Sequence, residues 1–168
     1  MSDVDDTVER LAGTVAEHAR SSGRTVAVAE SLTGGLVASA LAKAPDASTW
    51  FRGAVVAYSS EVKHEVLGVP DGPVVSAEAA RVMVDGVRRL LGADVAVAVT
   101  GAGGPDPQDG RPPGTVFIAV DDGVRPAHVT ALQLDGGPEE ICAASTEQVL
   151  TVLAERMTLA VCETRPAG

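Results

Sequence analysis

The stretch VAVAESLTGG, Val26–Gly35, joins two segments whose apolar residues are spaced differently. Residues Thr25–Ala29 are β-branched or small and apolar, which predicts a short buried strand that stops at Glu30. The next segment predicts a helix over Thr33–Ala44, which Pro45 ends. A turn between a strand and a helix can be a plain connection, a cradle for a phosphate, or a site that presents a nucleophile. The local pattern leaves all three roles open.

The rest of the chain alternates between strand and helix patterns. Further strands are predicted over Gly53–Tyr58, Asp94–Thr100, Thr115–Val120 and Ala127–Leu134, the last two as a hairpin. Further helices are predicted over Asp5–Ser22, Ser59–Leu67, Pro138–Glu163, and from the N-cap Ser76 to Leu91. This order predicts a single α/β domain over residues 1–168, built as a three-layer α-β-α sandwich around a mixed, mostly parallel sheet.

Three turns follow predicted strands, and ligands bind at the carboxyl ends of strands in such sheets. The turns are Glu30–Gly35, Ser59–Lys63 and Thr100–Gly104. If their strands are neighbours, the turns converge on one cleft. The third turn opens the irregular stretch GAGGPDPQDGRPPG, Gly101–Gly114, with five Gly and four Pro. A loop of this length is typical of a functional or a disordered segment.

Composition and charge argue against several classes of protein. The chain has 168 residues, 45% of them hydrophobic and 21% charged, as in soluble globular proteins. A net charge of −10 and the lack of a Lys/Arg run argue against a nucleic-acid partner. No apolar stretch has the length of a membrane span and the N-terminus lacks a signal-peptide pattern, so a cytoplasmic protein is expected.

The two cysteines predict no disulfide. Cys142 and Cys162 lie in one predicted helix, where a rise of about 1.5 Å per residue separates them by about 30 Å. That separation is far beyond disulfide reach. Both are expected to be buried small hydrophobic residues.

Common phosphate and metal motifs are absent. The G-x-G-x-x-G pattern fails at Asp106, no P-loop motif occurs, and the histidines have no partners at ligand spacing, so no metal is expected. Ser60–Lys63 matches S-x-x-K but lacks the companion motifs of that enzyme class. Ordinary roles therefore remain open at this point: a turn residue for Ser31, helix caps for Ser59 and Ser60, a solvated lysine for Lys63, and core positions for Trp50, Phe51 and Tyr58.

Several separated segments resemble the CinA C-terminal-domain family, and they occur in the same order. They are AESLTGG (Ala29–Gly35), WFRGAVVAYSSEVKHEVLGV (Trp50–Val69), VSAEAARVM (Val75–Met83), and the two ends of Asp94–Val120, DVAVAVTGAGGPD and RPPGTVFIAV. The resemblance extends over nearly the whole chain, from Val8 to Leu153. No counterpart of the amino-terminal domain of full CinA proteins is seen, so the chain resembles the stand-alone form.

The resemblance implies a nicotinamide-nucleotide amidohydrolase, which converts nicotinamide mononucleotide to nicotinic acid mononucleotide and ammonia. It implies that Ser31, in the A-E-S-x-T-G-G motif, is the nucleophile. It also implies that Lys63, in the Y-S-x-E-x-K motif, is the base and that Tyr58 of the same motif belongs to the site. A homo-oligomer, most simply a dimer, is expected from the resemblance alone. The expected ligand is a small nucleotide, with no cofactor, membrane or nucleic-acid partner.

Amide hydrolysis by these residues is chemically coherent. It needs a nucleophile, a base and donors for the oxyanion. Lys63 acts as a base only when neutral, yet at its ordinary pKa only roughly one lysine in 2,500 is neutral at pH 7, so desolvation must lower its pKa. Trp50, Phe51 and Val62 are expected to supply the apolar surroundings. The expected substrate-binding residues are Thr33, Gly34, Gly35, Thr100, Gly101, Gly103 and Gly104, whose turns offer backbone N–H groups.

One segment departs from the family pattern. The family usually has a G-D-R element before the last helix and another arginine soon after, whereas LDGGPEEICAAS, Leu134–Ser145, holds no basic residue. Arg111, which precedes the P-x-G-T motif where the family has a basic residue, is the first candidate to replace the missing charge, and Arg52 is the second. Two hypotheses follow: a working amidohydrolase with an altered substrate preference or weaker phosphate binding, and a non-catalytic relative that keeps the fold and binds a nucleotide or a partner.

Overall fold

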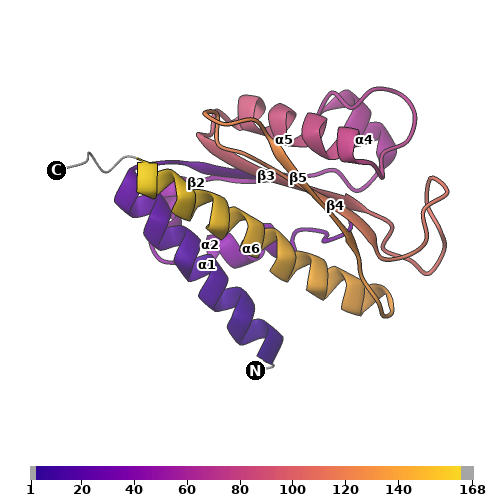
Figure 1. Ribbon diagram of the computed structural model, residues 1–168, viewed down its shortest axis with the longest axis horizontal. Coiled ribbons are helices and arrows are strands. Elements are labelled where there is room, and N and C mark those ends of the chain that lie inside the picture. Colours follow the sequence, from indigo (N-terminus) through magenta and orange to yellow (C-terminus); the bar gives the residue numbers. More distant parts are fainter. Residues whose placement is uncertain (1–2, 164–168) are drawn as a thin grey trace.

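A computed structural model describes the backbone of residues 3–163 and the side chains of residues 3–159. Within this range the elements follow in the order α1 (Asp3–Ser22), β1 (Val26–Glu30), α2 (Leu36–Ala42), α3 (Ala47–Trp50), β2 (Phe51–Val56), α4 (Ser60–Glu65), α5 (Ala77–Leu91), β3 (Val95–Gly101), β4 (Thr115–Asp121), β5 (His128–Gln133) and α6 (Pro138–Glu163). Figure 1 shows the sheet as a middle layer, with α1, α2 and α6 on one side and α4 and α5 on the other. The expected three-layer α-β-α arrangement is confirmed.

The five strands form one mixed sheet in the order β2-β1-β3-β4-β5. β1 is parallel to both β2 and β3, whereas β4 is antiparallel to its two neighbours, so four strands run one way and β4 runs the other. The predicted hairpin of β4 and β5 and the mostly parallel sheet are therefore confirmed. Because β2, β1 and β3 are adjacent, their carboxyl ends lie next to one another at one edge of the sheet.

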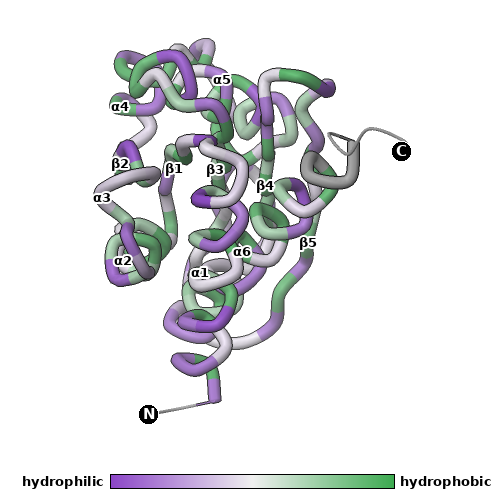
Figure 2. The backbone as a smooth tube through the Cα atoms, turned by 90° about the vertical axis from the view of Figure 1, so that its left-hand side faces the viewer, coloured by the Kyte–Doolittle hydropathy of each residue, from purple (hydrophilic) through white to green (hydrophobic). Residues whose placement is uncertain are grey.

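Valine and alanine alternate along β1 and β3, and the alternation sends them to opposite faces of the sheet. Val28 and Val97 belong to the core formed with α1 and α6. Ala29 and Ala98 belong to the core formed with α5. Both faces are buried, which explains why these strands are apolar throughout. Figure 2 shows hydrophobic stretches along β3 and β4 in the interior.

The helix predicted over Thr33–Ala44 is the least accurate of the predicted elements. The observed helix α2 begins only at Leu36, because Gly34 and Gly35 adopt φ values of 59° and 104°, which lie outside the right-handed helical range. The short helix α3 was not expected at all. It is held by the indole N–H of Trp50, which donates to the Pro45 carbonyl at 3.0 Å. By contrast, the cap at Ser76 is confirmed, since its hydroxyl accepts from the Ala79 N–H at 3.0 Å.

A buried ion pair closes the turn between β4 and β5 against α6. Asp122 accepts a hydrogen bond of 2.7 Å from Arg156 and two more from the backbone N–H groups of Val124 and Arg125. Burial by itself raises the pKa of Asp122, but the bonds from Arg156, Arg125 and Val124 lower it, and the net pKa lies far below its ordinary value. Asp122 therefore stabilises the fold at neutral pH in its charged form.

Asp122 gives a prediction on pH and stability. Because its folded pKa lies below the unfolded value, its contribution is fully present above about pH 5 and is lost progressively as the pH falls toward the folded pKa. Asp122→Asn should lower the free energy of unfolding by about 3 kcal/mol at pH 7, because it leaves Arg156 without its buried partner. At pH 3 the difference in free energy of unfolding between Asp122→Asn and wild type should be smaller than at pH 7. Urea unfolding at both pH values measures this, and an equal gap at both would contradict it.

None of the described helices is both long and apolar enough to cross a membrane.

Candidate functional site

The turn after β1 is organised by the buried side chain of Glu30. Its carboxylate accepts hydrogen bonds from the Thr33 hydroxyl at 2.7 Å and from the N–H groups of Gly35, Val37 and Ala38 at 3.2, 3.0 and 2.9 Å. These donors are the ones that the start of a helix offers to an anion. The Gly34 N–H is also engaged, since it donates to the Ser31 carbonyl at 3.0 Å.

The expectation that Thr33, Gly34 and Gly35 bind the oxyanion or phosphate of a substrate is therefore corrected. The acceptor at this helix start is the protein's own Glu30 carboxylate, and the three residues do not line the pocket described below. What this turn does is hold Ser31, the residue directly after Glu30, at the carboxyl edge of the sheet.

Removing the Glu30 carboxylate should destabilise the protein strongly. Glu30→Ala leaves four donors without their acceptor in a buried turn, so the free energy of unfolding should fall by about 3–5 kcal/mol. Glu30→Gln keeps one acceptor oxygen and should lose less. Glu155→Ala changes an exposed carboxylate on α6 and should stay within about 0.5 kcal/mol of wild type. Equal unfolding midpoints for Glu30→Ala and Glu155→Ala in urea would contradict this role.

Ser31 lines a pocket of about 630 Å³ at the carboxyl ends of β2, β1 and β3, which we call the Ser31 pocket. Its lining consists of Ser31, Leu32, Leu36, Tyr58, Gly101, residues 103–108, Pro138, Glu139, Cys142 and Ala143. Ser31 is only 5% exposed, and among the described residues its hydroxyl makes no hydrogen bond. A hydroxyl of a pocket-lining residue that has no hydrogen-bond partner in the protein is available to a bound molecule.

The loop after β3 forms one wall of the Ser31 pocket through Gly101, Gly103 and Gly104. Gly101 must be glycine because a Cβ there would lie 2.8 Å from the Thr115 carbonyl oxygen of β4. The N–H groups of Gly103 and Gly104 donate to no acceptor within the described part of the chain. They are available donors at the pocket wall.

The Gly/Pro loop has a defined conformation in the structure. Gln108 and Arg111 exchange backbone hydrogen bonds of 3.1 and 2.8 Å. The Asp109 carboxylate accepts from the N–H groups of Val74 and Val75 at 2.7 and 2.9 Å, which ties the loop to the segment before α5. The alternative of a disordered loop is therefore wrong.

Lys63 does not line the pocket, but it is bonded to a residue that does. Lys63 is 1% exposed, and its Nζ donates to the Tyr58 carbonyl at 3.4 Å. Tyr58 itself is 72% exposed and lines the pocket. Burial lowers the pKa of Lys63, and the nearby Asp109 carboxylate opposes this shift. Among the described residues no hydrogen bond joins Lys63 to Ser31.

The apolar surroundings expected for Lys63 are corrected in part. Val62 packs against the core on the α5 side of the sheet. Trp50 and Phe51 pack against the opposite core, on the α1 and α6 side, with ring centroids 6.0 Å apart. The sheet lies between the two cores, so the lysine is desolvated without the two aromatic residues. Tyr58, for which a core position had also been left open, is exposed and does not belong to the core.

Two further expected substrate-binding residues, Thr100 and Arg111, also lie outside the pocket. Thr100 is fully buried, and its hydroxyl donates to the Val74 carbonyl at 2.6 Å, which is a structural contact. The Arg111 guanidinium lies over the Phe117 ring, 5.5 Å from its centroid, and does not line the pocket. Arg52, the second candidate for a basic residue, donates to the Leu91 carbonyl at 2.9 Å. None of the three lines the Ser31 pocket.

The segment without a basic residue lies directly at the pocket. Pro138, Glu139 and Cys142 at the start of α6 all line it. Cys142 is half-buried, donates weakly to the Leu32 carbonyl at 3.4 Å, and has its thiol pKa raised by burial and by the charge of Glu30. The expectation that Cys142 is a simple core residue is wrong, whereas the Cys162 side chain lies outside the described residues. Sequence spacing could not place the start of α6 beside the turn after β1, so this wall was missed.

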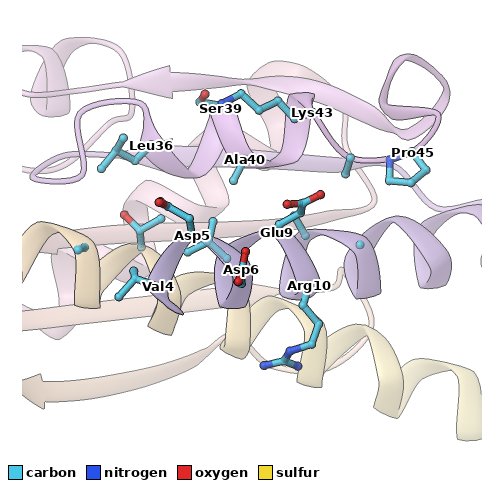
Figure 3. Close-up of a pocket in the computed structure, with 16 residues that line it drawn as sticks. Val4, Asp5, Asp6, Glu9, Arg10, Leu36, Ser39, Ala40, Lys43 and Pro45 are labelled. Carbon is cyan, nitrogen blue, oxygen red and sulfur yellow. The ribbon is translucent and has the colours of Figure 1, made fainter. Parts of the chain in front are cut away.

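A second, larger hollow of about 860 Å³ lies between α1 and α2. Figure 3 shows Val4, Asp5 and Glu9 of α1 facing Leu36, Ser39 and Ala40 of α2 across it. It contains none of the residues expected to react. Leu36 and Ala143 line both hollows, so the two are neighbours. Within the described residues no group of three or more His, Cys, Asp or Glu could hold a metal ion.

Known proteins are similar to this chain in sequence and in fold. The family described as the CinA C-terminal domain matches residues 8–157. The chain belongs to the CinA C-terminal domain family. A CinA-like protein from Geobacter metallireducens is 44% identical over 120 residues, covering 68% of this chain and 29% of that protein. A CinA-like protein from Frankia casuarinae is 48% identical over 101 residues, covering 57% of this chain and 23% of that one.

Solved structures of CinA proteins have the same fold. A CinA superfamily protein from Klebsiella pneumoniae superposes with a TM-score of 0.84 at 30% identity, covering 90% of this chain and 98% of that one. One from Escherichia coli has a TM-score of 0.84 at 29% identity, covering 92% and 93% of the two chains. This chain spans about a third of the length of the curated CinA relatives that it matches.

Proposed function

We propose that this CinA domain hydrolyses the carboxamide of a nicotinamide nucleotide or of its nucleoside, with Ser31 as nucleophile and Lys63 as base. The observation that carries the proposal is Ser31, a buried residue that lines the pocket and whose hydroxyl makes no hydrogen bond among the described residues. A buried lysine with a lowered pKa, Lys63, donates to the carbonyl of Tyr58, which lines the same pocket. A hydroxyl nucleophile that is activated by a neighbouring base can cleave an amide without a metal ion.

The proposed reaction has two steps. Ser31 Oγ attacks the amide carbon, its proton passes to neutral Lys63, and the amide C–N bond breaks when the amine takes a proton and leaves as ammonia. Water then attacks the acyl-serine ester, which releases the carboxylic acid and restores the Ser31 hydroxyl. The N–H groups of Gly103 and Gly104 are the candidate donors to the oxyanion in both steps.

The second candidate function is a non-catalytic module that binds a nucleotide or a partner. What favours it is the lack of any lysine or arginine among the described residues that line the Ser31 pocket. A phosphorylated substrate would find no cation there.

Ammonia release distinguishes the two functions. Purified protein is incubated with nicotinamide mononucleotide and, separately, with nicotinamide riboside, and ammonia is measured by a coupled assay. Release that depends on Ser31 supports the amidohydrolase. If neither compound releases ammonia, the amidohydrolase is contradicted and the binding module is favoured.

A further inference from the structure

The Ser31 pocket is acidic. Two carboxylates line it, Asp106 from the loop after β3 and Glu139 from the first turn of α6. No lysine or arginine of the described chain lines it. A pocket of one charge sign concentrates ligands of the opposite sign and repels those of the same sign.

Three basic residues were candidates to supply a positive charge to the pocket, and each of them is bound or buried outside it. Arg111 lies over the ring of Phe117, and Arg52 donates to the Leu91 carbonyl. Lys63 is buried, and burial lowers its pKa and disfavours its charged form. None of these side chains lines the pocket, so none balances Asp106 and Glu139 there.

The backbone offers little more to a phosphate. At the start of α2 the N–H groups of Gly35, Val37 and Ala38 already bind the Glu30 carboxylate. The N–H groups of Gly103 and Gly104 remain, but they are needed for the oxyanion in the proposed reaction. A phosphomonoester, with about two negative charges at pH 7, would thus be bound without a counter-charge and next to two carboxylates.

We infer that the substrate of this pocket is a carboxamide without a phosphate, and specifically a pyridinium carboxamide nucleoside. This inference rests on the proposed amidohydrolase function. The pyridinium ring carries one positive charge, which Asp106 and Glu139 attract, and the ribose is uncharged. The overall reaction is carboxamide plus water giving carboxylate plus ammonium, and no other reactant is needed.

The first test compares nicotinamide riboside with nicotinamide mononucleotide, which differ only in the phosphate. In wild type at low ionic strength kcat/KM should be at least about tenfold higher for the riboside. Added KCl should lower kcat/KM for the riboside and raise it for the mononucleotide, because salt screens an attraction in one case and a repulsion in the other. A higher kcat/KM for the mononucleotide, or salt effects of the same sign, would overturn the inference.

A binding measurement separates this inference from the proposed activity. Calorimetric titration of the Ser31→Ala protein, which cannot form the acyl-serine, reports selectivity without turnover. Tighter binding of the riboside supports an acidic, phosphate-free site even if wild type releases no ammonia, which would contradict only the activity. Equal binding, tighter binding of the mononucleotide, or no binding of either compound would overturn the inference.

Charge reversal at the pocket tests the cause. Glu139→Lys should reduce the preference for the riboside over the mononucleotide by about tenfold. Glu155→Lys is the matched control, since it makes the same charge change at an exposed position of the same helix, outside the pocket. It should leave the preference unchanged. An equal effect of both substitutions would assign the preference to net charge and overturn the role of the pocket.

Discussion

Ser31→Ala should abolish ammonia release while leaving the protein as stable as wild type. Removing a nucleophilic hydroxyl lowers kcat by about 10³-fold or more, because the covalent route is lost and only binding and oxyanion stabilisation remain. Stability should change by less than about 1 kcal/mol, because the Ser31 hydroxyl makes no hydrogen bond among the described residues. The measurements are ammonia release and thermal unfolding of the same preparation.

The matched control is Ser39→Ala. Ser39 is an exposed serine of α2 that lies outside the Ser31 pocket, so its substitution should leave kcat unchanged. Turnover that survives in Ser31→Ala would contradict the assignment of the nucleophile. A large loss of stability in Ser31→Ala would show instead that the hydroxyl has a structural role.

Lys63→Met should be nearly inactive and more stable than wild type. A positioned general base contributes about 10²- to 10⁴-fold to kcat, so a loss of that size is expected. The wild-type rate should rise with pH through the lowered pKa of Lys63, because the neutral amine is the active form, and this ionisation should disappear from the profile of the variant. A pH–rate profile of kcat/KM for both proteins measures this.

The stability of Lys63→Met follows from the same burial. Between the lowered folded pKa and the ordinary unfolded value the unfolded chain binds more protons at this lysine, so wild-type stability rises with pH across that window. Replacing the buried amine by an apolar side chain of similar size should therefore raise the free energy of unfolding at pH 7, by about 1–3 kcal/mol, and the gain should shrink toward pH 10.5.

The chain provides its own control for Lys63. Its one other lysine, Lys43, is exposed, and Lys43→Met should change neither the pH–rate profile nor the stability by more than about 0.5 kcal/mol. An unchanged pH–rate profile in Lys63→Met would contradict its role as base. A Lys63→Met protein less stable than wild type would contradict the argument from desolvation.

Elements with strong local patterns were predicted almost to the residue. The short apolar runs of β1 and β3 predict buried strands. The bounds of α5 are also predicted locally, because the Ser76 side chain caps its start and Gly92, in the left-handed conformation, ends it. The segment 33–50 was predicted less well. Its conformation depends on Glu30 holding the turn and on Trp50 bonding to Pro45, which are contacts that no local propensity encodes.

Some residues of the candidate site could likewise be placed from the sequence, and others could not. The position of Ser31 after β1 and of Tyr58 after β2 follows from the order of strands and turns, because adjacent parallel strands end at the same edge of a sheet. The acidic wall of the pocket does not follow from it. Asp106 and Glu139 are 33 positions apart by their numbers, and only the packing of α6 across the sheet beside the loop after β3 brings their charges to one pocket.

Local sequence thus specified the strands, the caps and the turn that carries Ser31, since backbone propensity and apolar periodicity act over a few neighbouring residues. Packing of distant segments specified how that turn is used. It buried Lys63 without Trp50 and Phe51 and brought Asp106 and Glu139 to the Ser31 pocket, whereas the neighbouring Glu30 carboxylate took the donors of the expected anion site. Burial and electrostatics depend on which surfaces meet in space, and in this fold those surfaces come from segments far apart in the sequence.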